Sequence, residues 1–406
     1  MNGPGGFVAT RDDGLRRLKD FVPRAGSDYA KSRSFDHGPA ERGNVSLLSP
    51  YLRHRLVGED EVVRAVLSRH RISGAQKFVE EVCWRTYWKG WLEQRPGVWS
   101  AYLGDLARDR ARVAGDGELA RRYGAALAGE TGIAAFDAWS RELVADGYLH
   151  NHARMWFASI WIFTLRLPWT LGADVFYRHL LDGDPASNTL SWRWVAGLHT
   201  RGKIYVARAE TIRHGTGGRF DPQGQLDEAP EAPDGPEPPS ASRLRPPMSV
   251  PPQTPVVLLV GEDDLTPERW PIAPKDVTGV ALLPADTGYP GLADPVVAFR
   301  CAAIRDAEAR TRRVFDCPVT ALATPGADDV AAFCRALGAD VAVTAQVPVG
   351  PSRATLDALI GGLEGSGLAI LEIRRDWDSA FWPYARHGFF KLKARIPEVL
   401  ERLELL

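Results

Sequence analysis

The chain has 406 residues, which is enough for about two or three domains with cores of ordinary size. Its 45% hydrophobic and 25% charged residues exclude a collagen-like, coiled-coil or wholly disordered protein. The net charge of −1 conceals two unlike halves: Lys and Arg outnumber Asp and Glu by 32 to 24 as far as Phe220, and are outnumbered by 27 to 18 after it. Of the 13 Trp, 10 lie between Trp84 and Trp194, and 11 of the 30 Pro lie between Pro222 and Pro255. Composition therefore divides the chain into a basic, tryptophan-rich part and an acidic part, joined by a proline-rich segment.

Neither export nor a metal site is expected. The four cysteines are far apart and form no CxxC pair, which argues against a zinc site, an iron–sulfur cluster and a disulfide-stapled fold. The first ten residues lack the apolar core of a signal peptide. The longest apolar stretch, 155–167, is too short to span a bilayer and contains Arg166. We expect a cytoplasmic protein that does not enter membranes and is monomeric.

The first half is predicted to be helical. From about Asp12 to Phe220 apolar residues recur at spacings of three and four, as on the buried face of a helix, and prolines stand at the ends of these stretches. The clearest helices are predicted over 59–70, 75–93, 136–146 and 150–167. No alternating strand pattern is found here, so residues 1–220 are interpreted as an all-helical domain.

The second half follows a proline-rich linker over 221–255, which is too polar to bury a core and is expected to be extended. After it, short apolar runs alternate with helical stretches, a pattern typical of a parallel, Rossmann-like α/β domain over 256–406. The runs cover 256–260, 279–283, 319–323, 341–344 and 368–373, and the helical stretches cover 296–314, 327–337 and 353–363. No glycine-rich phosphate-binding motif indicates a dinucleotide or triphosphate here.

Polar residues in the tryptophan-rich region suggest a binding site. Asn151, Arg154 and Met155 share one helix face, and the polar members would need partners if they were buried. Asp182 and Asp184, in an Asp-Gly-Asp turn, are natural partners for Arg154. The alternatives are a polar stripe that faces solvent and an ordinary turn or helix cap.

Four segments give these residues a family context: NVSLLSPYL (44–52), AQKFVEEVCWRTYW (75–88), DGYLHNHARM (146–155) and LLDGDPASNTLSWRW (180–194). Together they resemble the FAD-binding helical domain of the photolyase/cryptochrome superfamily. The resemblance implies an Arg154–Asp182 ion pair beside the isoalloxazine ring, with Asp184 bonded to its polar edge and Asn188 facing its N5 atom. Val45 stands where a threonine is common, which removes one donor from the phosphate end. The cofactor-binding residues that it implies are Tyr29, Ser46, Ser49, Phe78, Arg85, Arg154, Asp182, Asp184 and Asn188.

The resemblance also implies a substrate, UV-damaged DNA. It assigns Glu81 and Asn151 to hydrogen bonds with a flipped pyrimidine dimer, and it makes Trp84, Met155 and Trp194 the apolar contacts of that dimer. The (6-4) photolyases carry a histidine pair where this chain has Asn151 and Met155, so the site resembles the cyclobutane-dimer type. The alternative for the helix around Glu81 is ordinary amphipathic packing.

Electron supply and DNA contact are the remaining implications of the resemblance. Trp192 and Trp169 match the inner two members of the family's electron-transfer chain, and the outer member is missing from 115–123. Possible substitutes are Trp161, Trp156 and Trp139, although any single Trp is more often a core residue. A basic cluster, expected either to contact phosphates or simply to be solvated, consists of Arg201, Lys203, Arg208, Arg213 and Arg219.

The α/β half resembles the antenna domain that normally precedes the helical domain in photolyases, beginning with VVLLVGEDDLTPE (256–268). The two domains would then occur in reversed order. Alternatives are an unrelated flavodoxin-like module or a domain that docks a protein partner, and a second antenna chromophore is left undecided. The net negative charge of this half argues against a DNA-binding surface on it. The hypotheses for the whole chain are a cyclobutane-dimer photolyase, a cryptochrome-like photoreceptor without repair activity, or a structural protein without flavin.

Overall fold

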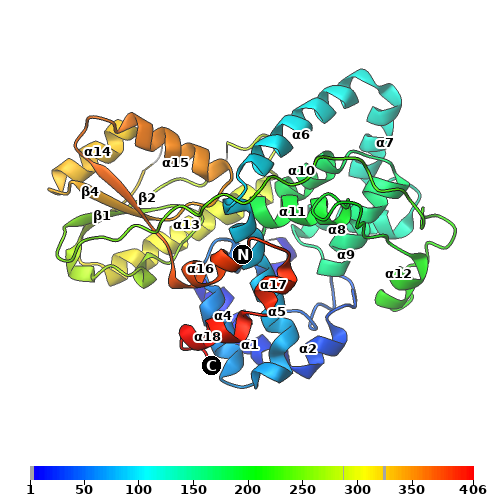
Figure 1. The fold of residues 1–406 in the computed structure, drawn as a ribbon, viewed down its shortest axis with the longest axis horizontal. Helices are drawn as coiled ribbons and strands as arrows, with labels where there is room; N and C mark the ends of the chain where they lie inside the picture. Colours follow the sequence, from blue (N-terminus) through cyan, green and yellow to red (C-terminus); the bar gives the residue numbers. More distant parts are fainter. Residues whose placement is uncertain (1–3, 287, 323–325) are drawn as a thin grey trace.

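The computed structural model describes residues 4–286, 288–322 and 326–406. Figure 1 shows a sheet with its helices on one side of the molecule and a larger helical region on the other. Both expected folds are therefore present: helices without a strand over the described part of 1–220, and a parallel sheet after 255. None of the helices over the described ranges is long and apolar enough to cross a membrane.

The helical region is built around one long central helix, α5 (Ile72–Glu93), which packs against α2, α4 and α11. Burial on most of its circumference explains its mixture of aromatic and small residues. The expected helix over 150–167 divides into α9 (Asn151–Ser159) and a π-helical turn (Ile160–Thr164), and it ends before Pro168. The other helices are α1 (Arg11–Phe21), α2 (Ser27–Ser32), α3 (Ser49–Arg53), α4 (Glu59–Leu67), α6 (Gly97–Gly115), α7 (Gly117–Ala128), α8 (Ala134–Asp146), α10 (Trp169–His179), α11 (Pro185–Val195) and α12 (Ala209–Gly215).

The sheet has the strand order β3-β2-β1-β4-β5, and every neighbouring pair is parallel. Its strands are β1 (Val256–Val260), β2 (Val277–Leu282), β3 (Val319–Ala321), β4 (Val341–Ala345) and β5 (Ala369–Ile373). Alternate residues of β1 face opposite layers: Val257 and Leu259 pack with α14 (Ala327–Ala336) and α15 (Pro351–Gly362), whereas Leu258 packs on the side of α13 (Asp294–Val314). Because both faces are covered, the central strand β1 is a continuous, fully buried apolar run.

The segment over 221–255 contains neither helix nor strand and crosses between the two regions on the outside of the molecule (Figure 1). It is fastened near its end. The backbone N–H of Ser242 donates to the carbonyl of Gln94 over 2.8 Å, and Arg245 bonds both Glu93, at 3.2 Å, and Glu372, at 3.1 Å. The linker is thus attached to the end of α5 and to β5.

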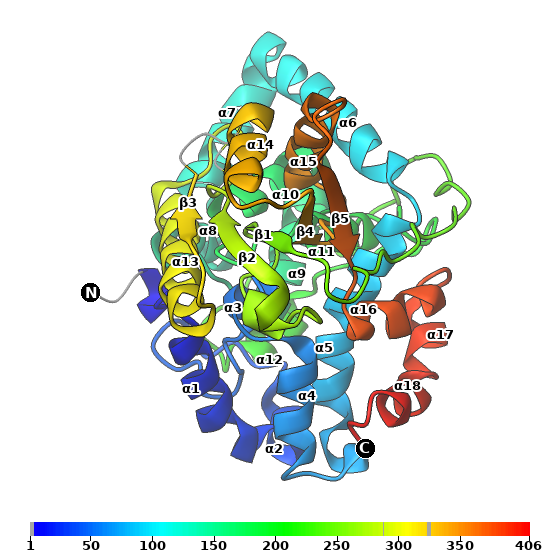
Figure 2. The same ribbon diagram turned by 90° about the vertical axis from the view of Figure 1, so that its left-hand side faces the viewer.

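The last helices of the chain leave the sheet and pack against the helical region. They are α16 (Asp376–Phe381), α17 (Phe389–Lys393) and α18 (Ile396–Arg402), and both α16 and α17 contact α5 (Figures 1 and 2). Gly90 permits the approach, because a Cβ there would lie 2.6 Å from the Trp382 ring. The sheet thus ends at Ile373 within the predicted domain over 256–406, and α16 and α17 lie against the helical region.

A buried ionic network joins the two regions. The Arg53 guanidinium bonds Asp263 at 2.6 Å and Glu262 at 3.1 Å, and its Nε donates to the Gly183 carbonyl over 2.8 Å. Arg55 bonds Asp378 at 2.9 Å. All of these side chains are buried. The acidic loop after β1 is thus docked on the arginines that follow α3.

Replacing Arg53 with Met should lower the free energy of unfolding by about 3–5 kcal/mol, because it leaves the buried carboxylates of Glu262 and Asp263 without their main counter-charge. The matched control is Arg269→Met, which removes ion pairs to Asp60 and Glu61 across the same interface near the surface and should cost at most about 1 kcal/mol. Urea unfolding followed by far-UV circular dichroism measures both. Equal losses in the two variants would contradict the importance assigned to the buried network.

Candidate cofactor and substrate site

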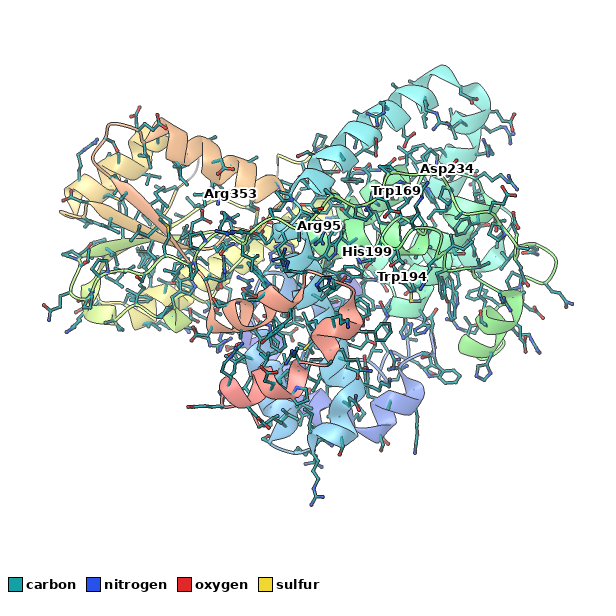
Figure 3. All side chains as sticks on the ribbon, viewed as in Figure 1. Arg95, Trp169, Trp194, His199, Asp234 and Arg353 are labelled. Carbon is teal, nitrogen blue, oxygen red and sulfur yellow. The ribbon has the colours of Figure 1, made fainter. Side chains whose placement is uncertain are left out.

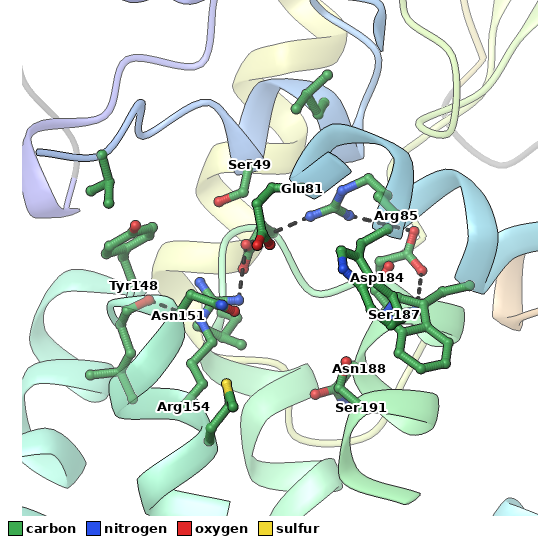
Figure 4. A pocket seen from close by; sticks show the side chains of 18 of the residues that line it. Ser49, Glu81, Arg85, Tyr148, Asn151, Arg154, Asp184, Ser187, Asn188 and Ser191 are labelled. Atoms are coloured by element: carbon green, nitrogen blue, oxygen red, sulfur yellow. Dashed lines mark hydrogen bonds and ion pairs between the residues drawn. The ribbon is translucent and has the colours of Figure 1, made fainter. Parts of the chain in front are cut away.

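A cavity of about 470 Å³ opens between α5, α9, α11 and the segment before α3 (Figure 4). Ser49, Glu81 and Arg85 lie on one side of it in this view, and Arg154, Asn188 and Ser191 lie opposite. All but one of the residues that the sequence assigned to a site line this cavity. They are Tyr29, Ser46, Ser49, Phe78, Glu81, Trp84, Arg85, Asn151, Arg154, Met155, Asp182, Asp184, Asn188, Trp192 and Trp194.

The floor of the cavity is a cluster of buried charges. Arg154 bonds Asp182 at 3.0 Å, Lys89 lies 3.2 Å from Asp184, and Arg85 lies between the two carboxylates at 3.8 and 3.7 Å. Burial alone would raise the carboxyl pKa values, but Arg154 keeps the pKa of Asp182 below its ordinary value, and Lys89 does the same for Asp184. Both acids are therefore ionised at neutral pH.

Asp184 has two functions at once. Its carboxylate accepts a hydrogen bond of 2.8 Å from the backbone N–H of Ser187, which caps α11, and it also pairs with the cations of α5. The helix-cap alternative is therefore confirmed for this residue, and its ion pairs leave the predicted binding role open as well. Arg154 is likewise paired, as expected, and does not belong to a solvated stripe.

Several polar atoms in the cavity wall have no hydrogen-bond partner within the described residues: Asp182 Oδ1, Arg85 Nη1 and Ser187 Oγ. Leaving such groups unpaired costs about 1–3 kcal/mol each, so a ligand with both donors and acceptors would be bound favourably. The Asn188 side chain donates to the Ala173 carbonyl over 2.7 Å, which fixes its amide in the wall. The cavity is therefore suited to a ligand that both donates and accepts hydrogen bonds.

Another part of the cavity wall is formed by Tyr29 and residues 45–49. Leu47 adopts a left-handed conformation with φ of +54°, which costs about 1 kcal/mol or more for a residue with a side chain. Ser49 is the first residue of α3, and its hydroxyl is not used to cap that helix. Tyr29 packs edge-on against Phe78 with ring centroids 5.1 Å apart. Hydroxyls and backbone N–H groups are thus gathered in this part of the wall.

The mouth of the cavity carries the predicted substrate residues. Glu81 pairs with Arg33 at 2.6 Å, and burial raises the pKa of Glu81 although Arg33 opposes that shift. Trp84 is stacked on one face by Phe389, with centroids 3.6 Å apart, and Trp194 stacks on Tyr205 at 5.5 Å. Asn151 is exposed at the rim.

Three neighbours of the predicted residues were not anticipated: Lys89, Arg33 and Phe389. Lys89 stands four residues after Arg85 on the same face of α5, a spacing that could have identified it. The contacts of Arg33 with Glu81 and of Phe389 with Trp84 join distant parts of the chain, and no local pattern announces them.

Trp169 is the predicted site residue that does not line the cavity. Its ring lies 5.6 Å from Tyr102 and 5.8 Å from the Arg193 guanidinium, and Figure 3 shows it on the far side of His199 from Trp194. Three residues were named as possible substitutes for the missing outer tryptophan. Of these, Trp161 lies edge-on to Trp192, with 6.2 Å between the ring centroids. Trp139 and Trp156 instead stack on each other at 5.7 Å.

Comparison with known proteins finds similarity over part of this chain. Residues 78–227 match the family described as the FAD binding domain of DNA photolyase. A deoxyribodipyrimidine photo-lyase of Streptomyces griseus is 36% identical over 182 residues, 42% of this chain and 38% of that protein. One from Thermus thermophilus is 33% identical over 211 residues, 52% of this chain and 48% of that protein. A bacterial class III photolyase structure from Agrobacterium tumefaciens aligns with a TM-score of 0.42 at 29% identity, covering 51% of this chain and 43% of that one. The chain spans less than half the length of the two photo-lyases.

The cavity fits the cofactor of the matched family. The unpaired Asp182 Oδ1 suits the N–H of a flavin ring, and the unpaired Arg85 Nη1 and Ser187 Oγ suit its carbonyl oxygens. The hydroxyls of Ser46 and Ser49 suit the pyrophosphate. The residues of this cavity therefore fit FAD, the cofactor named in the description of the matched domain.

Acid should destabilise the protein through the histidines beside the site. Burial lowers the pKa of His150 to about 4, so this side chain stays neutral in the folded protein while it is protonated in the unfolded chain below about pH 6.5. The unfolded state then binds more protons, and the free energy of unfolding should fall between about pH 6.5 and 4, by as much as about 3 kcal/mol from this residue. Chemical unfolding at stepped pH measures the slope.

The variant that tests this cause is His150→Asn, because Asn can still accept the bond from the His152 N–H that begins α9. It should flatten the acid slope without removing it, since burial also lowers the pKa of His152 to about 4. The control is His37→Asn, which removes an exposed histidine and should leave the acid slope as it is in the wild type. An unchanged slope in His150→Asn would show that another group causes the acid loss.

Proposed function

We propose that this chain, whose residues 78–227 belong to the FAD-binding family of DNA photolyases, reverses cyclobutane pyrimidine dimers in DNA under blue light. The observation that carries the proposal is the single cavity in which a charged floor and an aromatic mouth meet. Reduced FAD, when bound, supplies one electron on illumination and recovers it once the two carbon–carbon bonds of the cyclobutane ring have broken. Every other contribution comes from side chains of this protein.

The charged floor holds the cofactor and sets its electrostatic environment. Arg85, Lys89 and Arg154 face two carboxylates, so the cluster carries one positive charge in excess. In a buried site such a charge stabilises negative charge on a bound group. Asn188, fixed by its bond to Ala173, keeps a neutral amide beside the ring, as the family resemblance implies.

The mouth is proposed to bind the two linked pyrimidines of the lesion. Glu81 and Asn151 are proposed to accept and donate hydrogen bonds at the exposed pyrimidine edges, and Arg33 holds the Glu81 carboxylate in place at 2.6 Å. Trp84 and Trp194 offer aromatic surface that replaces the stacking lost when the dimer leaves the helix. Neither Asn151 nor Met155 is a histidine, which favours the cyclobutane over the (6-4) lesion.

Trp192 is proposed as the residue that delivers electrons for activation of the cofactor, because it lines the cavity and is buried. Trp169 remains the next member expected from the family pattern. The contact with Trp161 offers a second direction out of the site, since Trp161 lies 5.9 Å from Tyr123.

A blue-light photoreceptor is the second candidate. It is favoured by the covered face of Trp84, on which Phe389 leaves less of the ring for a base, and by the ion pair that already engages Glu81. The flavin site would be the same in both functions. Affinity for DNA that contains a dimer, together with dimer loss under light, distinguishes them.

The cofactor assignment predicts that Arg85→Gln weakens FAD binding about tenfold, because a charged hydrogen-bond donor contributes about 1.5–3 kcal/mol. Arg154 and Lys89 would still neutralise the two carboxylates, so the fold should persist. Flavin absorbance of the purified protein and titration of apoprotein with FAD measure the loss. Arg110→Gln, which removes a partly exposed pair with Asp174, is the control and should bind FAD as the wild type does.

Repair is tested by illuminating reduced protein with an oligonucleotide that contains one thymine dimer and following dimer loss by chromatography. Glu81→Gln should repair about tenfold more slowly at unchanged FAD content, because it keeps an acceptor but loses the charged hydrogen bond. The exposed Glu118→Gln is the control. If the wild type binds FAD but removes no dimers, the repair proposal fails and the photoreceptor remains.

A further inference from the structure

A segment from the C-terminal end of the chain lies at the mouth of the cavity. Helix α17 packs on α5, and its Phe389 stacks almost parallel on Trp84, with an angle of 13° between the rings and 3.6 Å between the centroids. Trp84 itself lines the cavity. The lower part of the molecule in Figure 1 shows α17 beside α5. The aromatic mouth therefore contains a ring that the photolyase resemblance does not include.

The neighbouring residue, Phe390, is exposed in a way that packing does not explain. Its side chain is 78% accessible to solvent, the largest value among the exposed large apolar residues of the described ranges. Its ring lies 6.5 Å from that of Phe389. A row of rings thus extends from the cavity outward, from Trp84 through Phe389 to Phe390. An aromatic side chain held open to solvent beside a binding site suggests a contact surface.

The charge around these rings is basic, although the half of the chain that contains them is acidic. Residues 386–395 include four Lys or Arg and no Asp or Glu, whereas the chain after Phe220 has 18 basic and 27 acidic residues. Lys393 pairs with Glu80 of α5 at 2.9 Å, which holds α17 in place. Lys391 is exposed and has no ion pair within the described part of the chain. The net negative charge of the half therefore does not exclude DNA from this face.

We propose that α17 is part of the DNA-binding surface, an inference that rests on the proposed repair function. Phe389 positions Trp84, Phe390 stacks on a base of the strand that carries the lesion, and Lys391 contacts a backbone phosphate. Aromatic rings alternating with basic side chains are the usual means of holding a nucleic-acid strand without reading its sequence. The occupant is DNA and not a second protein, because the rings are continuous with the substrate cavity and the free charge beside them is positive.

The experiment measures binding in the dark, so that repair chemistry plays no part. Fluorescein-labelled duplexes with and without one thymine dimer are titrated with the FAD-loaded full chain, and anisotropy is recorded at several salt concentrations. The variants are Phe390→Ala and Lys391→Gln, both at exposed positions, and the control is Val314→Ala, an exposed apolar residue at the end of α13. FAD content and circular dichroism are recorded for each protein.

Phe390→Ala should weaken binding of the dimer duplex about fivefold or more, the value of one base–aromatic stack. Lys391→Gln should reduce the slope of log affinity against log salt by about 0.9, the value of one phosphate contact. The control should bind as the wild type does.

Three results would overturn the proposal. The first is an affinity and a salt slope that are unchanged from the wild type in both variants. The second is tighter DNA binding by Phe390→Ala, which would make α17 a cover over the site. The third is a wild-type protein that forms homodimers in solution, where Phe390→Ala dissociates the homodimer and leaves the DNA affinity unchanged. A wild type that does not prefer the dimer duplex would instead refute the repair function, and the variants would still test α17 on undamaged DNA. A wild type that binds neither duplex would refute both.

Discussion

The buried guanidinium of Arg53 is the interaction on which the arrangement of this protein depends. It bonds Glu262 and Asp263 in the loop after β1 and, through Nε, the carbonyl of Gly183. Gly183 lies between the two carboxylates of the cavity floor, Asp182 and Asp184. The same side chain therefore docks the α/β unit and fixes the turn that carries the two acids proposed to bind the flavin. Disturbing the docking should disturb the site, because the two share one side chain and no flexible segment separates them.

The charges of this network explain why the composition is so uneven. Arg53 and Arg300 balance Glu262 and Asp263 within the interface, whereas Arg55 is matched by Asp264 and Asp378. Part of the acidity of the second half is therefore directed at arginines of the first half and is not available to solvent. Fully paired networks of this kind tolerate burial, but they specify the partner surface strictly, since a shift in docking would leave ions unpaired. The acidic unit is held in one orientation for this reason.

The sequence was sufficient wherever structure depends on neighbours along the chain. Strand β1 was predicted at its observed bounds because five consecutive apolar residues can only be buried on both faces. Most of the predicted site residues lie in four short segments, and the structure gathers all of them except Trp169 around one cavity. What the sequence could not supply are contacts between distant segments. Phe389 meets Trp84, Arg375 meets Glu59, and Trp377 bonds Thr86 across separations that no local pattern records. The last helices can pack against α5 because Gly90 has no side chain. Nothing in the sequence distinguishes this glycine from the other glycines of the chain.

This return also changes what the division of the chain means. A unit that ended with the sheet would leave the aromatic face of α5 around Trp84 and Trp88 open to solvent, where large rings are unfavourable. Phe389 covers part of that face, Trp382 packs beside Gly90, and Lys393 fixes the helix by its bond to Glu80. The covering segment keeps Trp84 rigid at the cost of one of its faces, and it places Phe390 and Lys391 at the rim. An acidic module whose overall charge opposes nucleic acid thus includes a basic, aromatic helix, the one that we propose as part of a DNA-binding surface.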